Sequence, residues 1–562
     1  MIKLTSLTLA ELCVQASAKY KDRPAFELFQ SGGIRGQVSY SLLGIRARQI
    51  ASLLGRLGIN AGDRVLILAE NRPEWPLAYF GISLAGAVSV PVLTGFSSDQ
   101  IRYIIRHADV SAVCLSGAMA AKIENLGPAV PLIFIDSIIG APSGDPVITV
   151  SIRGGVQAVP LQDPADSRLP HRGADDPASI VYTSGTLGYS KGVMLSNRNL
   201  VSCARASRFL VPIHPRDRLL SVLPLAHTYE CTLGLLAAVM SGAKISYLDR
   251  PPSPSVLLPA AQALRPTCMI TVPLLIEKIY RLHIAPVLKA SRLYRNPLTR
   301  PLALSFAGRR LNTVLGGSIR FFGIGGAPLA PEVEDFLRKA RFPYSPGYGL
   351  TETAPLVAGT APYRFPLRSA GGLLRGIQVR ISAEDGSSTG EGIGEIQVRG
   401  PNVMLGYFKD EEQTRRAFTD GWFRTGDLGR LDKKGRLYIK GRLKALILGP
   451  AGENIYPEEI EGVLNASQMV EDALVYPGEH GELVALVRLS ESARAAAQTA
   501  TEAAHAVKEA LEDLRYWANR RLAAFSRLSR IEARTAPFEK TPTLKIKRYL
   551  YAAPLPLRAP PQ

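Results

Sequence analysis

One loop of the chain carries side chains that can bind a row of phosphates. It follows a short apolar stretch at residues 180–182, which predicts a buried strand. The loop contains three hydroxyl side chains, two glycines and one lysine: Thr183, Ser184, Gly185, Thr186, Gly188 and Lys191. Glycines let backbone N–H groups approach an anion, hydroxyls add hydrogen-bond donors, and lysine adds a positive charge.

The loop is not a Walker A motif. Ser190 stands where that motif has a glycine, and Gly192 stands where it has Ser or Thr. The segment therefore predicts a triphosphate site of another type, and an ordinary Ser/Gly-rich loop is the alternative.

Further motifs follow in order along the chain. They lie at residues 323–329 together with 348–353, and at 421–428, 441–444, 452–461 and 539–548. With the loop at 180–193 they resemble the motifs of the AMP-forming adenylate superfamily, which includes acyl- and aryl-CoA synthetases, nonribosomal adenylation domains and luciferases. Leu187 and Ser190 depart from that pattern. The segments 223–230 and 537–543 are similar to long-chain fatty-acid–CoA ligases in particular.

The strands and helices that must position these motifs are predicted to form an α/β fold. Short apolar runs at residues 64–69, 112–115, 132–136, 244–248 and 268–272 predict strands, and amphipathic stretches such as 40–57 and 99–107 predict helices. Strands that alternate with helices favour open, largely parallel sheets. Residues 75–93 carry no charge, but prolines bracket them, so we expect a buried helix followed by a core strand.

We expect two domains, because 562 residues are too many for one core. The first, residues 1–443, binds the nucleotide through layered open sheets. It includes a small β-barrel-like subdomain at about 363–440, where glycine-punctuated strands such as 377–381 and 394–399 appear. The second, residues 444–562, is a small mobile α+β domain with an alanine-rich helix at about 493–522.

The resemblance implies roles for the residues that match each motif. The β- and γ-phosphates of ATP would be held by Thr183, Ser184, Gly185, Thr186 and Lys191. Thr351 would meet the α-phosphate, and Glu352 would bind Mg²⁺, with Thr183 as a second candidate metal ligand. Adenine would lie against Tyr348 and Gly349, with its edge on Gly325, Gly326, Ala327 and Pro328. Asp427 would bind the ribose hydroxyls, and Arg442 the ribose or phosphates. Without the resemblance, Glu352 would be a solvated glutamate, Tyr348 a core residue and Asp427 part of a turn.

Lys545 is the predicted catalytic lysine, because it lies in a Lys-Ile-x-Arg frame. Lys540, Lys547 and Arg548 are rival candidates, and a plain basic surface run is the alternative. The resemblance places a hinge at Lys444, about which the second domain rotates between two half-reactions. That rotation would bring Gly452, Glu453 and Asn454 to the pantetheine arm of CoA. Ala445 departs from the acidic or polar residue that is common after the hinge.

A pocket for the acyl group is predicted around His227, Tyr229 and Gly234, followed by a helix at about 231–240. His227 could gate the carboxylate end of the acid, and a structural histidine is an equal alternative.

The chain is strongly basic, with a net charge of +19. Between residues 278 and 320 there are nine Lys or Arg and no Asp or Glu, interleaved with apolar residues. This pattern favours contact with an anionic membrane, and a solvated helix face is the alternative. We expect no nucleic-acid binding, because no recognition module accompanies the charge. Five scattered cysteines and the lack of a signal peptide predict the cytoplasm, with peripheral attachment to the inner face of the membrane as an extension.

The predicted activity is the ATP- and Mg²⁺-dependent conversion of a medium- or long-chain fatty acid to its adenylate and then to its CoA ester. Two alternatives remain. One is an acyl-AMP ligase that loads an acyl carrier protein; since no carrier domain follows, we do not expect a self-loading module. The other is a ligand-binding pseudoenzyme, suggested by Leu187, Ser190 and Ala445. The predicted catalytic set of His227, Thr351, Glu352 and Lys545 opposes it.

Overall fold

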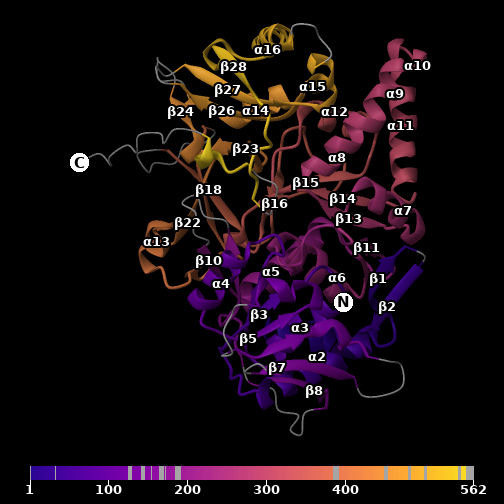
Figure 1. Cartoon of the computed structure of the whole chain (residues 1–562), viewed down its shortest axis with the longest axis vertical. Helices are drawn as coiled ribbons and strands as arrows, with labels where there is room; N and C mark the ends of the chain where they lie inside the picture. The colour runs from indigo at the N-terminus through magenta and orange to yellow at the C-terminus, as the bar shows by residue number, and fades with distance from the viewer. Residues whose placement is uncertain are drawn as a thin grey trace.

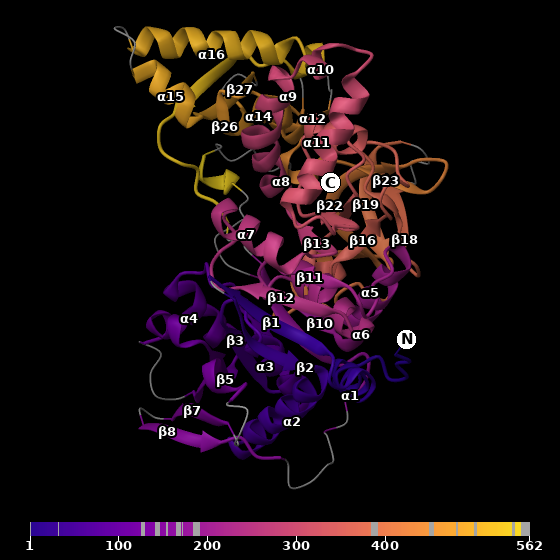
Figure 2. The same cartoon turned by 90° about the vertical axis from the view of Figure 1, so that its right-hand side faces the viewer.

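Two large β-sheets and their helices form most of the chain in this computed structural model (Figures 1 and 2). The structure describes residues 2–31, 33–124, 130–140, 146–152, 155–163, 170, 172–183, 191–383, 392–448, 454–478, 482–498, 503–541 and 546–551. One sheet has nine strands and the other has fourteen, and sheets of two and three strands follow nearer the C-terminus. The α/β fold class is as predicted.

The nine-stranded sheet is built mainly from the first two hundred residues. Its order is β20 (Gly406–Tyr407), β10 (Lys191–Ser196), β9 (Pro177–Thr183), β4 (Val88–Pro91), β3 (Arg64–Leu68), β5 (Val110–Leu115), β6 (Leu132–Phe134), β7 (Val147–Ile152) and β8 (Gly155–Pro160). Strands β9, β4, β3, β5 and β6 pair in parallel.

The central strand β3 is covered on both faces. Val65 and Ile67 belong to one apolar cluster, and Leu66 and Leu68 belong to another. The first cluster includes α1 (Leu9–Tyr20), α2 (Tyr40–Arg56) and α3 (Glu74–Leu84), and the second includes α4 (Ser98–His107). A strand buried on both faces needs apolar residues at every position, which explains the continuous apolar run.

Local signals fix the helices on this sheet. Helix α4 begins with a capping box, in which the Ser97 hydroxyl accepts from the Gln100 backbone N–H at 3.3 Å and the Gln100 side-chain oxygen Oε1 accepts from the Ser97 N–H at 2.9 Å. The uncharged residues 75–93 form the buried helix α3 and the core strand β4, as predicted. Among the described residues, no helix has the length and apolar character needed to cross a bilayer.

The fourteen-stranded sheet changes from parallel to antiparallel near its middle. Its path is β18 (Gln378–Ser382), β19 (Gly394–Arg399), β22 (Trp422–Leu431), β23 (Arg436–Arg442), β17 (Gly371–Leu373), β16 (Leu356–Gly359), β15 (Tyr344–Gly349), β14 (Phe321–Ile324), β13 (Cys268–Thr271), β11 (Arg218–Leu220), β12 (Lys244–Leu248), β1 (Pro24–Gln30) and β2 (Gly33–Ser39), with β21 (Phe418–Thr419) paired to β22. Pairs from β1 to β15 along this path are parallel, and pairs from β15 to β18 are antiparallel.

Further helices follow these strands in the chain. They are α5 (Asn197–Leu210), α6 (Ala237–Ser241), α7 (Pro254–Leu264), α8 (Pro273–Ile279), α9 (Ala285–Ala290), α10 (Arg292–Arg295), α11 (Arg300–Val314), α12 (Pro331–Lys339) and α13 (Glu411–Arg416).

Residues after 446 build an apolar core of their own. It joins β24 (Ile447–Leu448) and β25 (Asn454–Ile455) to α14 (Pro457–Asn465), β26 (Val470–Pro477), β27 (Leu483–Leu489), α15 (Glu491–Gln498), α16 (Ala503–Asn519) and β28 (Arg530–Arg534). The single helix predicted at 493–522 corresponds to two described helices, α15 and α16, and residues 499–502 lie outside the described residues.

Candidate functional site

Several of the predicted site residues follow the carboxyl ends of adjacent parallel strands. His227 and Tyr229 come after β11, Gly325 to Pro328 come directly after β14, and Thr351 comes two residues after the end of β15. Strands β11, β13, β14 and β15 are neighbours in one sheet. The carboxyl edge of such a sheet is where open α/β folds bind ligands.

The phosphate loop connects two strands of the other sheet. Thr183 ends β9 and Lys191 begins β10, and the two residues are direct antiparallel partners. The Lys191 ammonium donates to the Gln413 side chain and lies 5.2 Å from the centre of the Tyr407 ring. Ser184, Gly185 and Thr186 lie outside the described residues.

Glu352 is joined to Lys191 through the same tyrosine. It lies in the short helical turn η5 (Thr351–Thr353), and its carboxylate accepts a hydrogen bond from the Tyr407 hydroxyl at 3.0 Å. Burial and the negative charge of Glu352 raise the pKa of Tyr407 well above its ordinary value, so this hydroxyl stays a donor. The turn before Glu352 needs glycine at position 349, because a Cβ there would lie 1.8 Å from the Pro355 carbonyl oxygen.

The carboxylate of Glu352 is chemically suited to Mg²⁺. A carboxylate can accept several hydrogen bonds or metal contacts, and the Tyr407 hydroxyl donates to one of the two oxygens of Glu352. No cluster of three or more His, Cys, Asp or Glu suited to a metal occurs among the described residues. Mg²⁺ is commonly held by one or two carboxylates together with substrate phosphates and water.

Asp427 connects Tyr348 to Arg442. The Tyr348 hydroxyl donates to one carboxylate oxygen at 2.6 Å, and Arg442 Nε lies 2.7 Å from the other. The antiparallel pairing of β22 and β23 sets Asp427 directly opposite Arg442. Asp427 is only 4% exposed, and burial followed by its charge raises the pKa of Tyr348 well above the ordinary value. Burial opposes the charge on Arg442, yet Asp427, Tyr348 and Glu352 together raise the pKa of Arg442. The residues around Glu352 and those around Asp427 therefore share one electrostatic environment.

The predicted adenine loop touches the predicted acyl pocket. A Cβ on Gly325 would lie 3.2 Å from the Tyr229 ring, so glycine allows that ring to approach the main chain. Gly326 has φ of +87°, a conformation that favours glycine. His227 Nδ1 accepts from the Tyr229 N–H at 3.1 Å, which places the ring proton of the neutral imidazole on Nε2.

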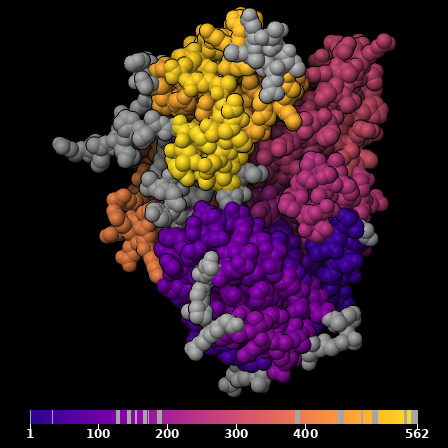
Figure 3. All heavy atoms as spheres, in the orientation of Figure 1, coloured from indigo at the N-terminus to yellow at the C-terminus, as the bar shows by residue number. Residues whose placement is uncertain are grey.

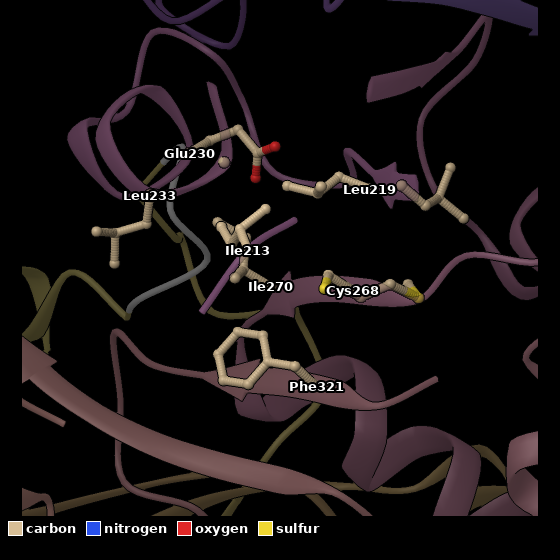
Figure 4. Close-up of a pocket in the computed structure, with 10 residues that line it drawn as sticks. Ile213, Leu219, Glu230, Leu233, Cys268, Ile270 and Phe321 are labelled. Atoms are coloured by element: carbon tan, nitrogen blue, oxygen red, sulfur yellow. The ribbon is translucent and has the colours of Figure 1, made fainter. Parts of the chain in front are cut away.

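A small apolar cavity lies beside the π-helical turn η3 (Tyr229–Leu236), which continues into α6 (Figure 4). Gly234 lines it, whereas His227 and Tyr229 do not; the other lining residues are Ile213, Leu219, Leu220, Glu230, Leu233, Cys268, Met269, Ile270 and Phe321. Its volume is about 20 Å³, the space of one water molecule. An alkyl chain would enter only if these side chains moved apart.

Glu230 is the one carboxyl group in that cavity lining, where its neighbours are carbon and sulfur groups. It is 2% exposed, its Oε2 has no hydrogen-bond partner, and burial raises its pKa from 4.5 to about 8. A Cβ on residue 234 would lie 2.6 Å from Glu230 Oε1, so Gly234 makes room for this carboxyl group.

This pKa predicts a pH-dependent stability that Glu230→Gln removes. The folded chain keeps the Glu230 proton between pH 4.5 and about 8, where the unfolded chain releases it. The stabilising contribution is therefore complete below pH 4.5 and is lost as the pH rises through 8, at about 1.4 kcal/mol for each pH unit. We expect the thermal midpoint of the variant, relative to that of the parent chain, to rise across this range. A constant difference between the two would contradict the protonated carboxyl group.

The C-terminal segment holds three of its basic side chains in ion pairs. Lys540 Nζ lies 2.7 Å from Asp472, Lys547 Nζ lies 3.2 Å from Glu539, and Arg548 pairs with the buried Glu461. Lys545 lies outside the described residues, as do Gly452 and Glu453. Lys444 lies in the helical turn η6 (Leu443–Ala445), and Asn454 begins β25.

Three residues of the site were not predicted. Tyr407 and Gln413 reach it from β20 and α13, and they follow no motif that would single them out. Glu230 lies within the segment 223–230 whose likeness to fatty-acid ligases was recognised, and its apolar neighbours were the available signal.

The sheets and the loops at their carboxyl edges have the fold of adenylate-forming enzymes. The structure superposes on o-succinylbenzoate CoA synthetase from Bacillus subtilis, solved with its acyl-adenylate intermediate, with a TM-score of 0.74 and 25% identity over 96% of this chain and 98% of that chain. The chain belongs to the AMP-binding enzyme family, which it matches over residues 13–408. It is 31% identical to the long-chain-fatty-acid–CoA ligase FadD15 of Mycobacterium bovis over 487 residues, 81% of this chain and 78% of that relative. It is 29% identical to 4-coumarate–CoA ligase of Vanilla planifolia over 498 residues, 84% of this chain and 82% of that relative.

Proposed function

We propose that the chain is an AMP-forming acid–CoA ligase, which uses ATP and Mg²⁺ to activate a medium- or long-chain fatty acid and passes the acyl group to CoA. The observation that carries the proposal is the linked group of Tyr348, Asp427, Arg442 and Glu352 on a fold of the AMP-binding family. Identity of 31% to a long-chain ligase over 81% of the chain supports the fatty acid as substrate.

In the first half-reaction a carboxylate oxygen attacks the α-phosphorus of ATP, and pyrophosphate leaves. Asp427 would accept hydrogen bonds from the ribose hydroxyls, and Tyr348, held in place through its bond to Asp427, would offer its ring to adenine. Lys191 and Thr183 are direct partners where the antiparallel strands β10 and β9 meet the phosphate loop. Both would hold the departing phosphates. Thr351 would donate to the α-phosphate. Mg²⁺ bound at Glu352 would offset negative charge on the phosphates.

In the second half-reaction the CoA thiolate attacks the acyl carbon, and AMP leaves. We place the moving part at residues 444–562 and the hinge at Lys444, so that residues 1–443 hold the nucleotide throughout. The separate apolar core after residue 446 supports a unit that can move as one body. Gly452, Glu453 and Asn454 would then flank the pantetheine arm.

The test is pyrophosphate release from a series of carboxylic acids, from acetate to stearate with benzoate and cinnamate, each with and without CoA. We expect CoA-dependent turnover that is highest on medium or long chains. Adenylate formation that CoA does not stimulate would assign the chain to the loading of an acyl carrier protein. Turnover that is highest on cinnamate or benzoate would contradict a fatty acid as the substrate.

A further inference from the structure

A projecting set of helices carries most of the basic segment that the sequence singled out. We call it the basic arm: η4 (Tyr280–Ile284), α9, α10 and α11, residues 280–314. In Figures 1 and 3 it stands at the upper right, at the edge of the molecule. Its inner side is fixed, because Leu288, Leu304 and Leu311 belong to the apolar cluster under the parallel strands.

The outer side of the basic arm is positive. Six of its basic side chains are exposed: Lys289, Arg292, Arg295, Arg300, Arg309 and Arg310. None of these six forms an ion pair with a carboxylate of the described residues. Arg295 and Arg300 instead donate through Nε to the carbonyl oxygens of Lys289 and Tyr294, at 3.1 and 3.0 Å. Their positive charge is therefore not compensated by a direct ion pair within the described part of the molecule.

The basic arm also exposes large apolar side chains. They are Leu282, Val287, Leu293, Leu298, Leu302 and Phe306, all at least 48% exposed, and Leu298 is 90% exposed. Isolated exposed apolar residues are normal, but six within thirty-five residues of one projection are a concentration, and exposed apolar patches mark interaction sites. The buried inner side prevents these side chains from turning into the core.

We propose that the basic arm docks on an anionic lipid bilayer, with its leucines and Phe306 in the interface and its arginines at the headgroups. Helices that lie in an interface combine apolar and Lys- or Arg-rich faces in this way, and long basic side chains reach headgroups while their stems stay in the apolar layer. The absence of any Asp or Glu between residues 278 and 320 matches a negative surface. Docking would bring the proposed ligase to the phase that holds its fatty acid, but the binding itself does not depend on that activity.

The experiment measures co-sedimentation of the full chain with vesicles of two parts phosphatidylcholine to one part phosphatidylglycerol, and with pure phosphatidylcholine. The charge variant is Arg292→Glu with Arg295→Glu, and the apolar variant is Leu298→Ser with Leu302→Ser. The matched control is Arg35→Glu with Arg106→Glu, two exposed arginines outside the basic arm that lower the net charge of +19 by the same four units. The thermal midpoint of each variant without vesicles reports whether it is folded.

We expect the parent chain to bind the anionic vesicles, and to bind more weakly at high salt because charges are then screened. The charge variant should bind at least about tenfold more weakly, since each basic residue near the surface contributes roughly fivefold. The apolar variant should also bind more weakly, and the control should bind like the parent.

Three results would overturn the proposal. The first is a parent chain that does not bind the anionic vesicles, the second is a charge variant that binds them as tightly as the parent, and the third is a control that loses as much vesicle affinity as the charge variant. A parent that binds an acidic carrier protein through the basic arm but ignores vesicles falls under the first of these. Vesicle binding is read without turnover, so a failed ligase assignment would not be mistaken for failed docking.

Discussion

Replacement of Lys545 by alanine is expected to lower ATP–pyrophosphate exchange by about 10²- to 10³-fold, the usual cost of losing one group that stabilises charge in a transition state. Conversion of preformed acyl-adenylate to the CoA ester should stay close to the parent rate, because the proposed rotation withdraws this lysine before the second step. The two half-reactions, measured separately, therefore give opposite results for one variant.

The neighbouring lysines supply matched controls for Lys545. Lys540 and Lys547 are engaged by Asp472 and Glu539, which leaves them less suited to act on a nucleotide. Both pairs are partly exposed, so Lys540→Ala and Lys547→Ala should cost about 1 kcal/mol of stability or less and leave exchange nearly unchanged. If Lys540→Ala abolished exchange while Lys545→Ala did not, the catalytic lysine would be reassigned.

Motifs and local patterns were enough to predict much of the fold. The predicted strands at 64–69, 244–248 and 268–272 are β3, β12 and β13, within a residue at each end. Those strands are buried on both faces. Such a strand needs apolar side chains along its whole length, and this continuous apolar run is visible in the sequence. The long helix predicted at 493–522 was less accurate, because helix-favouring composition alone does not mark an interruption.

The contacts that build the site were harder to predict, because they join residues far apart in the chain. Lys191 and Gln413 are 222 residues apart, and Tyr348 and Asp427 are 79 apart. Tyr407, which lies against Lys191, is placed by the pairing of the two-residue strand β20 with β10, and so short a strand leaves almost no pattern in the sequence. The motif predicts Asp427, whereas its pairing with Arg442 follows only from the register of β22 and β23.

Asp427→Ala is expected to raise the KM for ATP by about 10²-fold, because hydrogen bonds to an ionised carboxylate contribute about 1.5–3 kcal/mol and every 1.4 kcal/mol is a factor of ten. The variant should also be less stable by about 1–3 kcal/mol, since the buried Tyr348 hydroxyl loses the acceptor at 2.6 Å. The measurements are the KM for ATP in pyrophosphate exchange and the thermal midpoint with and without AMP.

Tyr348→Phe separates the binding role of Asp427 from its structural role. This variant removes the same hydrogen bond within the protein but keeps the carboxylate and its pairing with Arg442 at 2.7 Å. If Asp427 binds the ribose, Tyr348→Phe should retain most of its ATP affinity, and AMP should still raise its thermal midpoint, whereas Asp427→Ala should lose both. If Asp427 only anchors Tyr348, the two variants should behave alike. Equal KM values for ATP in the two variants would therefore contradict the ribose site. If the nucleotide does not contact Asp427, both variants affect it only through the lost hydrogen bond between Tyr348 and Asp427.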